Sequence, residues 1–143
     1  MKTLGELTLQ AHSGSIPEFL EFISGWAKEA GYGGQRIREM EFAVAEALTN
    51  IVEFVCTEGE EVTIRVGDDK GRRFVIHISD YGKSYNMLLE ADPFLSGSDP
   101  SEKRPSVSRI KRIGDVEYKR FEGKNYLVVT VYPASMGGST SSA

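Results

Sequence analysis

The chain has 143 residues, of which 40% are hydrophobic and 27% are charged, a length and composition that suit one globular domain. Its formal net charge of −4 argues against binding to a phosphate backbone, which needs a basic surface, so no direct nucleic-acid partner is expected. No apolar run approaches the ~20 residues that cross a bilayer, and no signal-peptide core opens the chain, so no membrane partner is expected.

The chain contains a single cysteine, Cys56, in an apolar helical stretch. One cysteine excludes an intrachain disulfide and a cysteine-based zinc site, and it is typical of a reducing compartment. We therefore expect a cytoplasmic protein in which this thiol is a small buried hydrophobe rather than a reactive group.

The first third of the chain predicts a strand followed by two helices. Residues 3–10 form the strand, and residues 13–15 break it and offer a helix cap. Apolar residues recur at helical spacing from Ile16 to about Ala30, and the glycines at 31, 33 and 34 end this helix. Trp26 belongs to it and is expected in the core rather than in an interface.

A second helix is predicted from Gln35 to about Cys56. At about 100° per residue its apolar positions fall in one arc, which should face the core; they are Ile37, Met40, Val44, Ala47, Leu48, Ile51 and Val55. The opposite face should look at either water or a ligand, and it carries Glu39, Glu46, Asn50 and Glu53.

The remaining chain predicts two hairpins separated by a loop and a short helix. Alternating apolar residues flank a turn at 68–71, which predicts a hairpin over residues 62–78. Residues 81–104 show no period, and a loop of this length in a compact domain is typically either a functional lid or binding loop or a disordered segment. A helix is predicted over 106–113, and a second hairpin over 116–121 and 126–132 with its turn at 122–125.

This order of elements contains no βαβ repeat. It therefore predicts an α+β fold, a two-layer sandwich with helices on one face of a mixed, mostly antiparallel sheet. Residues 1–136 should form one domain. Residues 137–143 contain only Gly, Ser, Thr and Ala and should be a disordered tail.

Glu46 and Asn50 are one helical turn apart and so share a face. An amide oxygen suits Mg²⁺, which takes one or two protein ligands and keeps phosphates and waters for the rest. A glutamate beside the terminal phosphate could take a proton from an attacking hydroxyl. Glu53, one further turn on, is either part of such a site or a bystander. The alternative is that all three belong to the solvated face of an amphipathic helix.

Asp80 ends a strand in which Phe74, Ile76 and Ile78 alternate, so its carboxylate should point toward the helices. A buried carboxylate is costly unless it is hydrogen-bonded. The exocyclic amine of adenine would supply such a bond, and the alternative is that Asp80 caps a helix or accepts from a turn amide. Gly82 would let the backbone approach a flat ring closely.

The sequence resembles the anti-sigma-factor serine kinases of bacteria in two motifs and one hairpin, and in their order along the chain. These are Glu46-Ala47-Leu48-Thr49-Asn50, Ile78-Ser79-Asp80-Tyr81-Gly82 and the final hairpin after Asp115. These proteins are a branch of the GHKL (histidine-kinase-like) ATPase superfamily, and the resemblance runs from about Leu7 to Tyr132. It implies a GHKL ATPase fold with Glu46 as general base and Asn50 as the Mg²⁺ ligand. Asp80 would bind the adenine amine.

The same resemblance implies an ATP-dependent protein-serine kinase that regulates transcription in a stress response. Its partners would be a sigma factor and a STAS-domain anti-anti-sigma factor, whose serine it would phosphorylate with Mg-ATP. A homodimer is also implied.

Four features depart from the family pattern, and one of them is a lid that holds only a single glycine, Gly97. Phe54 stands where a histidine is usual, and Ser84 replaces the second glycine of the box that begins at Asp80. Residues 103–108 replace the later glycine-rich box, whose backbone N–H groups normally close on phosphates, and Pro105 removes one N–H outright.

We assign Gly82, Ser84 and Arg104 to nucleotide binding, with the charge of Arg104, Lys103 or Arg109 taking the place of the lost amide contacts. Weak Mg-ATP binding, or none, is expected from these departures. The alternative function is a catalytically inactive GHKL-like module that sequesters a regulatory partner without nucleotide.

Overall fold

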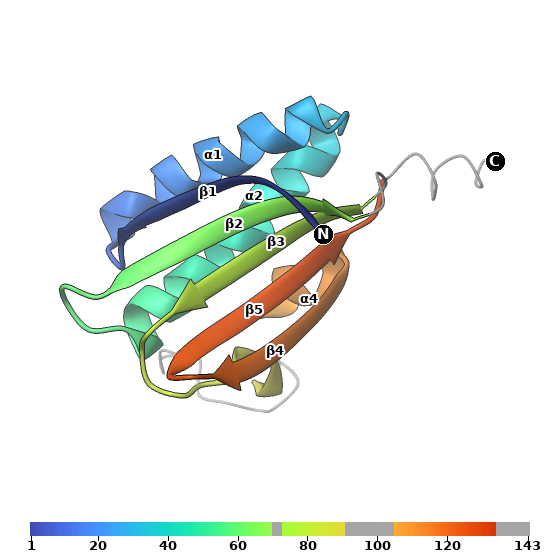
Figure 1. The fold of residues 1–143 in the computed structure, drawn as a ribbon. Helices are drawn as coiled ribbons and strands as arrows, with labels where there is room; N and C mark the ends of the chain where they lie inside the picture. The colour runs from blue at the N-terminus through green and yellow to red at the C-terminus, as the bar shows by residue number, and fades with distance from the viewer. Residues whose placement is uncertain (70–72, 91–104, 134–143) are drawn as a thin grey trace.

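A five-stranded sheet with helices on one face forms the described part of the computed structural model, residues 1–69, 73–90 and 105–133 (Figure 1). The sheet order is β1-β2-β3-β5-β4, and every described pairing is antiparallel. The predicted two-layer α+β architecture is confirmed. The strands are β1 Lys2–Gln10, β2 Glu61–Asp69, β3 Arg73–Asp80, β4 Asp115–Phe121 and β5 Lys124–Val131.

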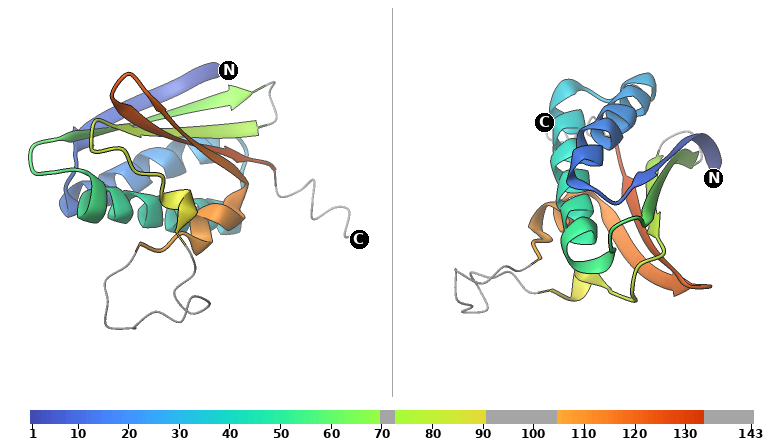
Figure 2. Two further views of the ribbon diagram at one scale, coloured as in Figure 1. Left: turned by 90° about the horizontal axis from the view of Figure 1, so that it is seen from below. Right: turned by 90° about the vertical axis from the view of Figure 1, so that its left-hand side faces the viewer.

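Two long helices cover the inner face of this sheet. They are α1, Ile16–Glu29, and α2, Gly34–Asn50, and the short α4, Ser108–Ile113, packs beside α2 (Figure 2). Short 3₁₀ turns occur at Ser13–Ser15 and Met87–Leu89. Among the described helices, none has the length and apolar character needed to cross a membrane.

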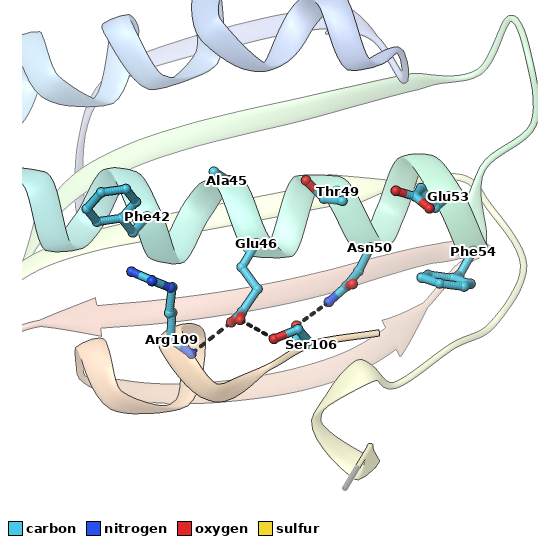
Figure 3. Close-up of a pocket in the computed structure, with 9 residues that line it drawn as sticks. All are labelled: Phe42, Ala45, Glu46, Thr49, Asn50, Glu53, Phe54, Ser106 and Arg109. Atoms are coloured by element: carbon cyan, nitrogen blue, oxygen red, sulfur yellow. Dashed lines mark hydrogen bonds between the residues drawn. The ribbon is translucent and has the colours of Figure 1, made fainter. Parts of the chain in front are cut away.

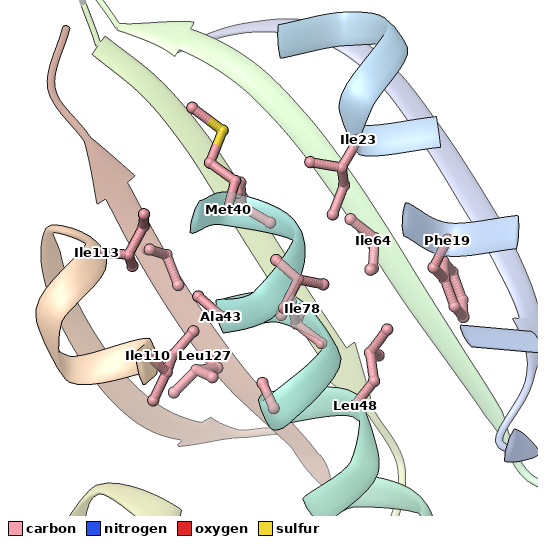
Figure 4. Close-up of a cluster of buried hydrophobic side chains, with 14 of the residues drawn as sticks. Phe19, Ile23, Met40, Ala43, Leu48, Ile64, Ile78, Ile110, Ile113 and Leu127 are labelled. Carbon is pink, nitrogen blue, oxygen red and sulfur yellow. The ribbon is translucent and has the colours of Figure 1, made fainter. Parts of the chain in front are cut away.

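The hydrophobic core lies between these helices and the inner face of the sheet (Figure 4). Phe19 and Ile23 enter it from α1, Ile64 and Ile78 from the sheet, and Ile110 from α4. The apolar arc predicted for the second helix is confirmed. Ile37 is partly buried, and the other six are buried: Met40, Val44, Ala47, Leu48, Ile51 and Val55.

The second helix differs from its prediction at its C-terminal end. The α-helix ends at Asn50 and continues as a π-helical turn, Ile51–Val55, in which Cys56 N donates to Ile51 O at 2.9 Å. In this wider turn the donor residue lies five positions after the acceptor residue. It keeps Ile51 and Val55 both in the core.

The turn of the second hairpin is tighter than predicted. Glu122 and Gly123 both have positive φ, 49° and 79°, the conformation that a two-residue hairpin turn requires. Strand β5 therefore begins at Lys124, and Asn125, predicted as a turn residue, is paired with Asp80 across the sheet.

Several predictions fall on residues outside the described part of the chain. The long loop is described from Tyr81 to Glu90 and again from Pro105, so Arg104 lies outside it. The same holds for the predicted tail at 137–143.

Candidate functional site

Glu46 of α2 caps the N-terminus of α4. Its Oε1 accepts hydrogen bonds from the backbone N of Arg109 and of Ile110, both at 2.9 Å, and its Oε2 accepts one from Ser106 Oγ at 2.6 Å (Figure 3). The first N–H groups of a helix have no partner within the helix, and Val107, at the cap position, supplies no side-chain bond. The Glu46 carboxylate fills that role from a neighbouring helix.

Asn50 is buried by the chain itself, with only 3% of its surface exposed. Its Nδ2 donates to Ser106 O at 2.8 Å and lies 3.6 Å from Met87 Sδ. The predicted polar face of α2 therefore differs at this position, because Met87 of the long loop and Ser106, which follows that loop, cover Asn50.

An open groove of about 390 Å³ runs along α2 beside Glu46 and Asn50. Arg109 lies on its wall with the guanidinium carbon 4.7 Å from the centre of the Phe42 ring, a distance typical of a cation–π contact. Phe54 also lines this groove, and so does Glu53.

Asp80 points into the interior, as its place in the strand predicts, and is 3% exposed. Its Oδ1 accepts from Gly82 N at 2.8 Å and from Asn125 Nδ2 at 2.9 Å. Burial raises the pKa of this carboxyl above its ordinary value, while the two hydrogen bonds oppose the shift.

Gly82 is required by close backbone packing. A Cβ at this position would lie 2.7 Å from Val55 Cγ1 and 2.8 Å from Val55 O. Because Gly82 has no side chain, its backbone can pack directly against Val55 at the end of the π-helical turn. Ser84, two residues on, is exposed.

Asn125 is a residue of the candidate site that the sequence did not predict. It is 5% exposed, and its Nδ2 donates to Lys83 O at 2.8 Å as well as to Asp80. Its Oδ1 accepts from Tyr118 Oη at 2.6 Å and from Arg120 Nη1 at 3.1 Å. One amide therefore joins the end of β3 to β4 and β5.

The sequence did contain a signal for this residue. In β5 the buried residues alternate, and Asn125 shares the inward face with Leu127, Val129 and Val131. A polar side chain on an otherwise apolar face needs hydrogen-bond partners, and assigning Asn125 to the turn concealed it.

Cys56 lies beside Asp80 at the end of the π-helical turn. Burial, together with the negative charge of Asp80, raises the pKa of its thiol to about 12. The thiolate is the reactive form, so this environment favours an inert cysteine, in line with the prediction.

The polar groups match the chemistry of Mg-ATP, but the space beside Asp80 does not fit adenine. The cavity there measures about 10 Å³ and is enclosed by Ile51, Tyr85 and Met87, among others. That volume holds about one water molecule, whereas ligand pockets typically measure ~300–1,000 Å³. Among the described residues, no group of three or more His, Cys, Asp or Glu side chains could hold a metal.

Comparisons with known proteins place the chain in a family. A family model described as the histidine kinase-like ATPase domain matches residues 9–107. The chain is 28% identical over 109 residues to the serine-protein kinase RsbW of Halalkalibacterium halodurans. The aligned region covers 76% of this chain and 64% of that protein, so the chain spans less than two thirds of the length of this relative. The resemblance to serine kinases stated from the motifs is thereby confirmed.

A solved structure shares the fold. The crystal structure of the RsbU and RsbW domains of a Mycobacterium tuberculosis protein matches with a TM-score of 0.60 and 13% identity, over 90% of this chain and 32% of that one. Because the family model covers more than half of the residues and the architecture agrees, the chain belongs to the histidine kinase-like ATPase domain family.

Proposed function

We propose that the chain is an anti-sigma-type regulatory factor that acts by binding protein partners, a sigma factor and a STAS-domain anti-anti-sigma factor. Its similarity to a serine-protein kinase supports the regulatory class. One observation supports action without nucleotide: Glu46, Asn50 and Asp80, the residues that the resemblance assigns to Mg-ATP, are all hydrogen-bonded within the chain.

The energetic cost of opening this site supports the same proposal. A hydrogen bond to a charged group contributes about 1.5–3 kcal/mol, and Glu46 and Asp80 together accept five such bonds. A nucleotide that replaced these contacts would bind more weakly by the cost of breaking them. Binding through a protein surface carries no such penalty.

The experiment is a binding titration with the sigma factors and STAS-domain proteins of the source genome. We expect a sigma factor to bind with the same affinity in the presence and absence of Mg-ATP. Failure of all these proteins to bind the folded chain would contradict the anti-sigma proposal. A requirement for Mg-ATP would contradict its nucleotide-independent form.

A protein-serine kinase is the second candidate, and it is favoured by the retention of Glu46 and Asn50 one turn apart on α2. Its test is transfer of the γ-phosphate to a STAS protein that has been shown to bind. Transfer that Glu46→Gln abolishes would establish this candidate, and no transfer by the wild type would exclude it. A homodimer and a cytoplasmic location also belong to this proposal, on the resemblance alone.

A further inference from the structure

A second groove, of about 550 Å³, is lined by residues of α1 and β1. Figure 1 shows these two elements side by side, and Glu46 and Asn50 belong to the other long helix, α2. The apolar lining of the groove consists of Leu7 from β1 and Phe22 and Trp26 from α1. All three are partly buried and pack against the edge of the core. Trp26, predicted in the core, is thus left with part of its ring at the surface.

Strand β1 is shaped to hold Trp26 in this position. A Cβ at Gly5 would lie 2.5 Å from Trp26 Nε1, so only glycine leaves room for the indole. The pairing register of β1 also shifts between Thr3 and Gly5. The apolar lining is therefore a fixed feature of the fold.

The rim of the groove is acidic. Glu18, Glu21 and Glu29 line it, and all three are exposed. None of them takes part in an ion pair within the described residues. Glu18 lies in the first turn of α1, where the helix dipole favours a carboxylate, whereas Glu29 is the last residue of the helix, where the dipole disfavours one.

Gly25 lies in the middle of α1 and lines the same groove. Glycine inside a helix is destabilising relative to alanine. A Cβ at this position would meet nothing within 4 Å, so packing within the chain does not require glycine. Close approach of another molecule to the helix would require glycine at this position.

We propose that this groove binds a basic, amphipathic helical segment of a partner protein. Its apolar side chains would pack on Phe22 and Trp26 across Gly25, and its Lys or Arg side chains would meet the acidic rim. The inference rests on the proposed function only in that the chain acts through protein partners. Pairing with a second copy would oppose the same carboxylates across a symmetric interface, and an anionic nucleic acid or membrane surface would be repelled.

The test uses a labelled synthetic helical peptide of about 18 residues, five turns, with leucines on one face and lysines on the other. At about 150 mM salt it should bind the wild type saturably, and a peptide with glutamate for lysine should not. The triple variant Glu18→Lys, Glu21→Lys and Glu29→Lys should weaken binding at least about tenfold. The neutral glutamine triple should weaken it less.

The matched control reverses three exposed glutamates away from the groove, Glu58, Glu61 and Glu122, with the same change in net charge. It should leave affinity within about twofold. Gly25→Ala should raise the melting temperature and still weaken peptide binding.

Absence of saturable binding, or equal weakening by both triple variants, would overturn the proposal. So would a dimer of the wild type that the groove triple dissociates, because the occupant would then be a second copy. The assay contains neither a sigma factor nor a STAS protein, so its failure is separate from failure of the proposed function.

Discussion

Asp80 shows how a single buried carboxylate is accommodated in this fold. Burial disfavours its charged form, and hydrogen bonds from Gly82 and Asn125 recover part of that cost. Its partners come from the turn after β3 and from the neighbouring strand β5. The sequence left either adenine or a turn amide as the hydrogen-bond partner of Asp80. In the structure its partners are the backbone N–H of Gly82, in the turn, and the side-chain amide of Asn125.

The raised pKa of Asp80 predicts a pH dependence of stability. Because the folded carboxyl holds its proton at a higher pH than the unfolded one, whose pKa is near 3.8, the folded state binds more protons in this window. Its stability contribution therefore increases as pH falls through the folded pKa toward 3.8. Urea unfolding should measure the free energy of unfolding of the wild type and of Asp80→Asn. The difference between the two should shift in favour of the wild type as the pH falls from 7 to about 4. A pH-independent difference would contradict this.

Cys56 should react slowly in the folded state. With its pKa near 12, far less thiolate is present at pH 8 than for a free cysteine of pKa ≈ 8.5. Alkylation by iodoacetamide, followed by mass spectrometry, should be at least about tenfold slower in buffer than in denaturant. Equal rates in both would show that the thiol is neither buried nor raised in pKa.

At the scale of elements, α4 depends on α2 for its N-terminal cap. The helix has only six residues, and a helix this short is not stable by itself. Glu46 supplies bonds to two of its backbone N–H groups, and Ile110 and Ile113 anchor it in the core. The same carboxylate that could act as a base is thus a structural link between two helices.

Replacing Glu46 by alanine should loosen α4 without unfolding the protein. Hydrogen exchange of the Arg109 and Ile110 amides should accelerate, because their acceptor is removed, and global stability should fall by about 1–3 kcal/mol. Thr49→Ala, at an exposed position of the same groove, is the matched control and should leave exchange unchanged. Unaltered exchange in the Glu46 variant would show that α4 is held by its apolar contacts alone.

At the scale of the whole molecule, periodicity predicted the architecture and the inward face of each long element. The buried arc of α2 and the inward direction of Asp80 follow from local repeats of 3.6 and 2 residues. The covering of Asn50 by Ser106, 56 residues away, and the pairing of Asp80 with Asn125, 45 residues away, depend on tertiary contacts. Local patterns carry no information on such contacts, so neither was predicted.

The two grooves divide the molecule into regions of different character. On the α2 side, polar residues of nucleotide-binding type are engaged by the chain's own backbone and side chains. On the α1 side, a partly exposed apolar lining lies beside three carboxylates that form no ion pair within the described residues. This distribution favours regulation through protein contacts.

Calorimetric titration of the wild-type chain with Mg-ATP and Mg-ADP tests the central claim most directly, because it measures whether the closed site admits a nucleotide. We predict no saturable heat and no change in melting temperature at millimolar nucleotide. A nucleotide present at a hundredfold over its dissociation constant would instead add about 2.7 kcal/mol of stability. Saturable one-to-one binding that Asp80→Asn abolishes would contradict the account.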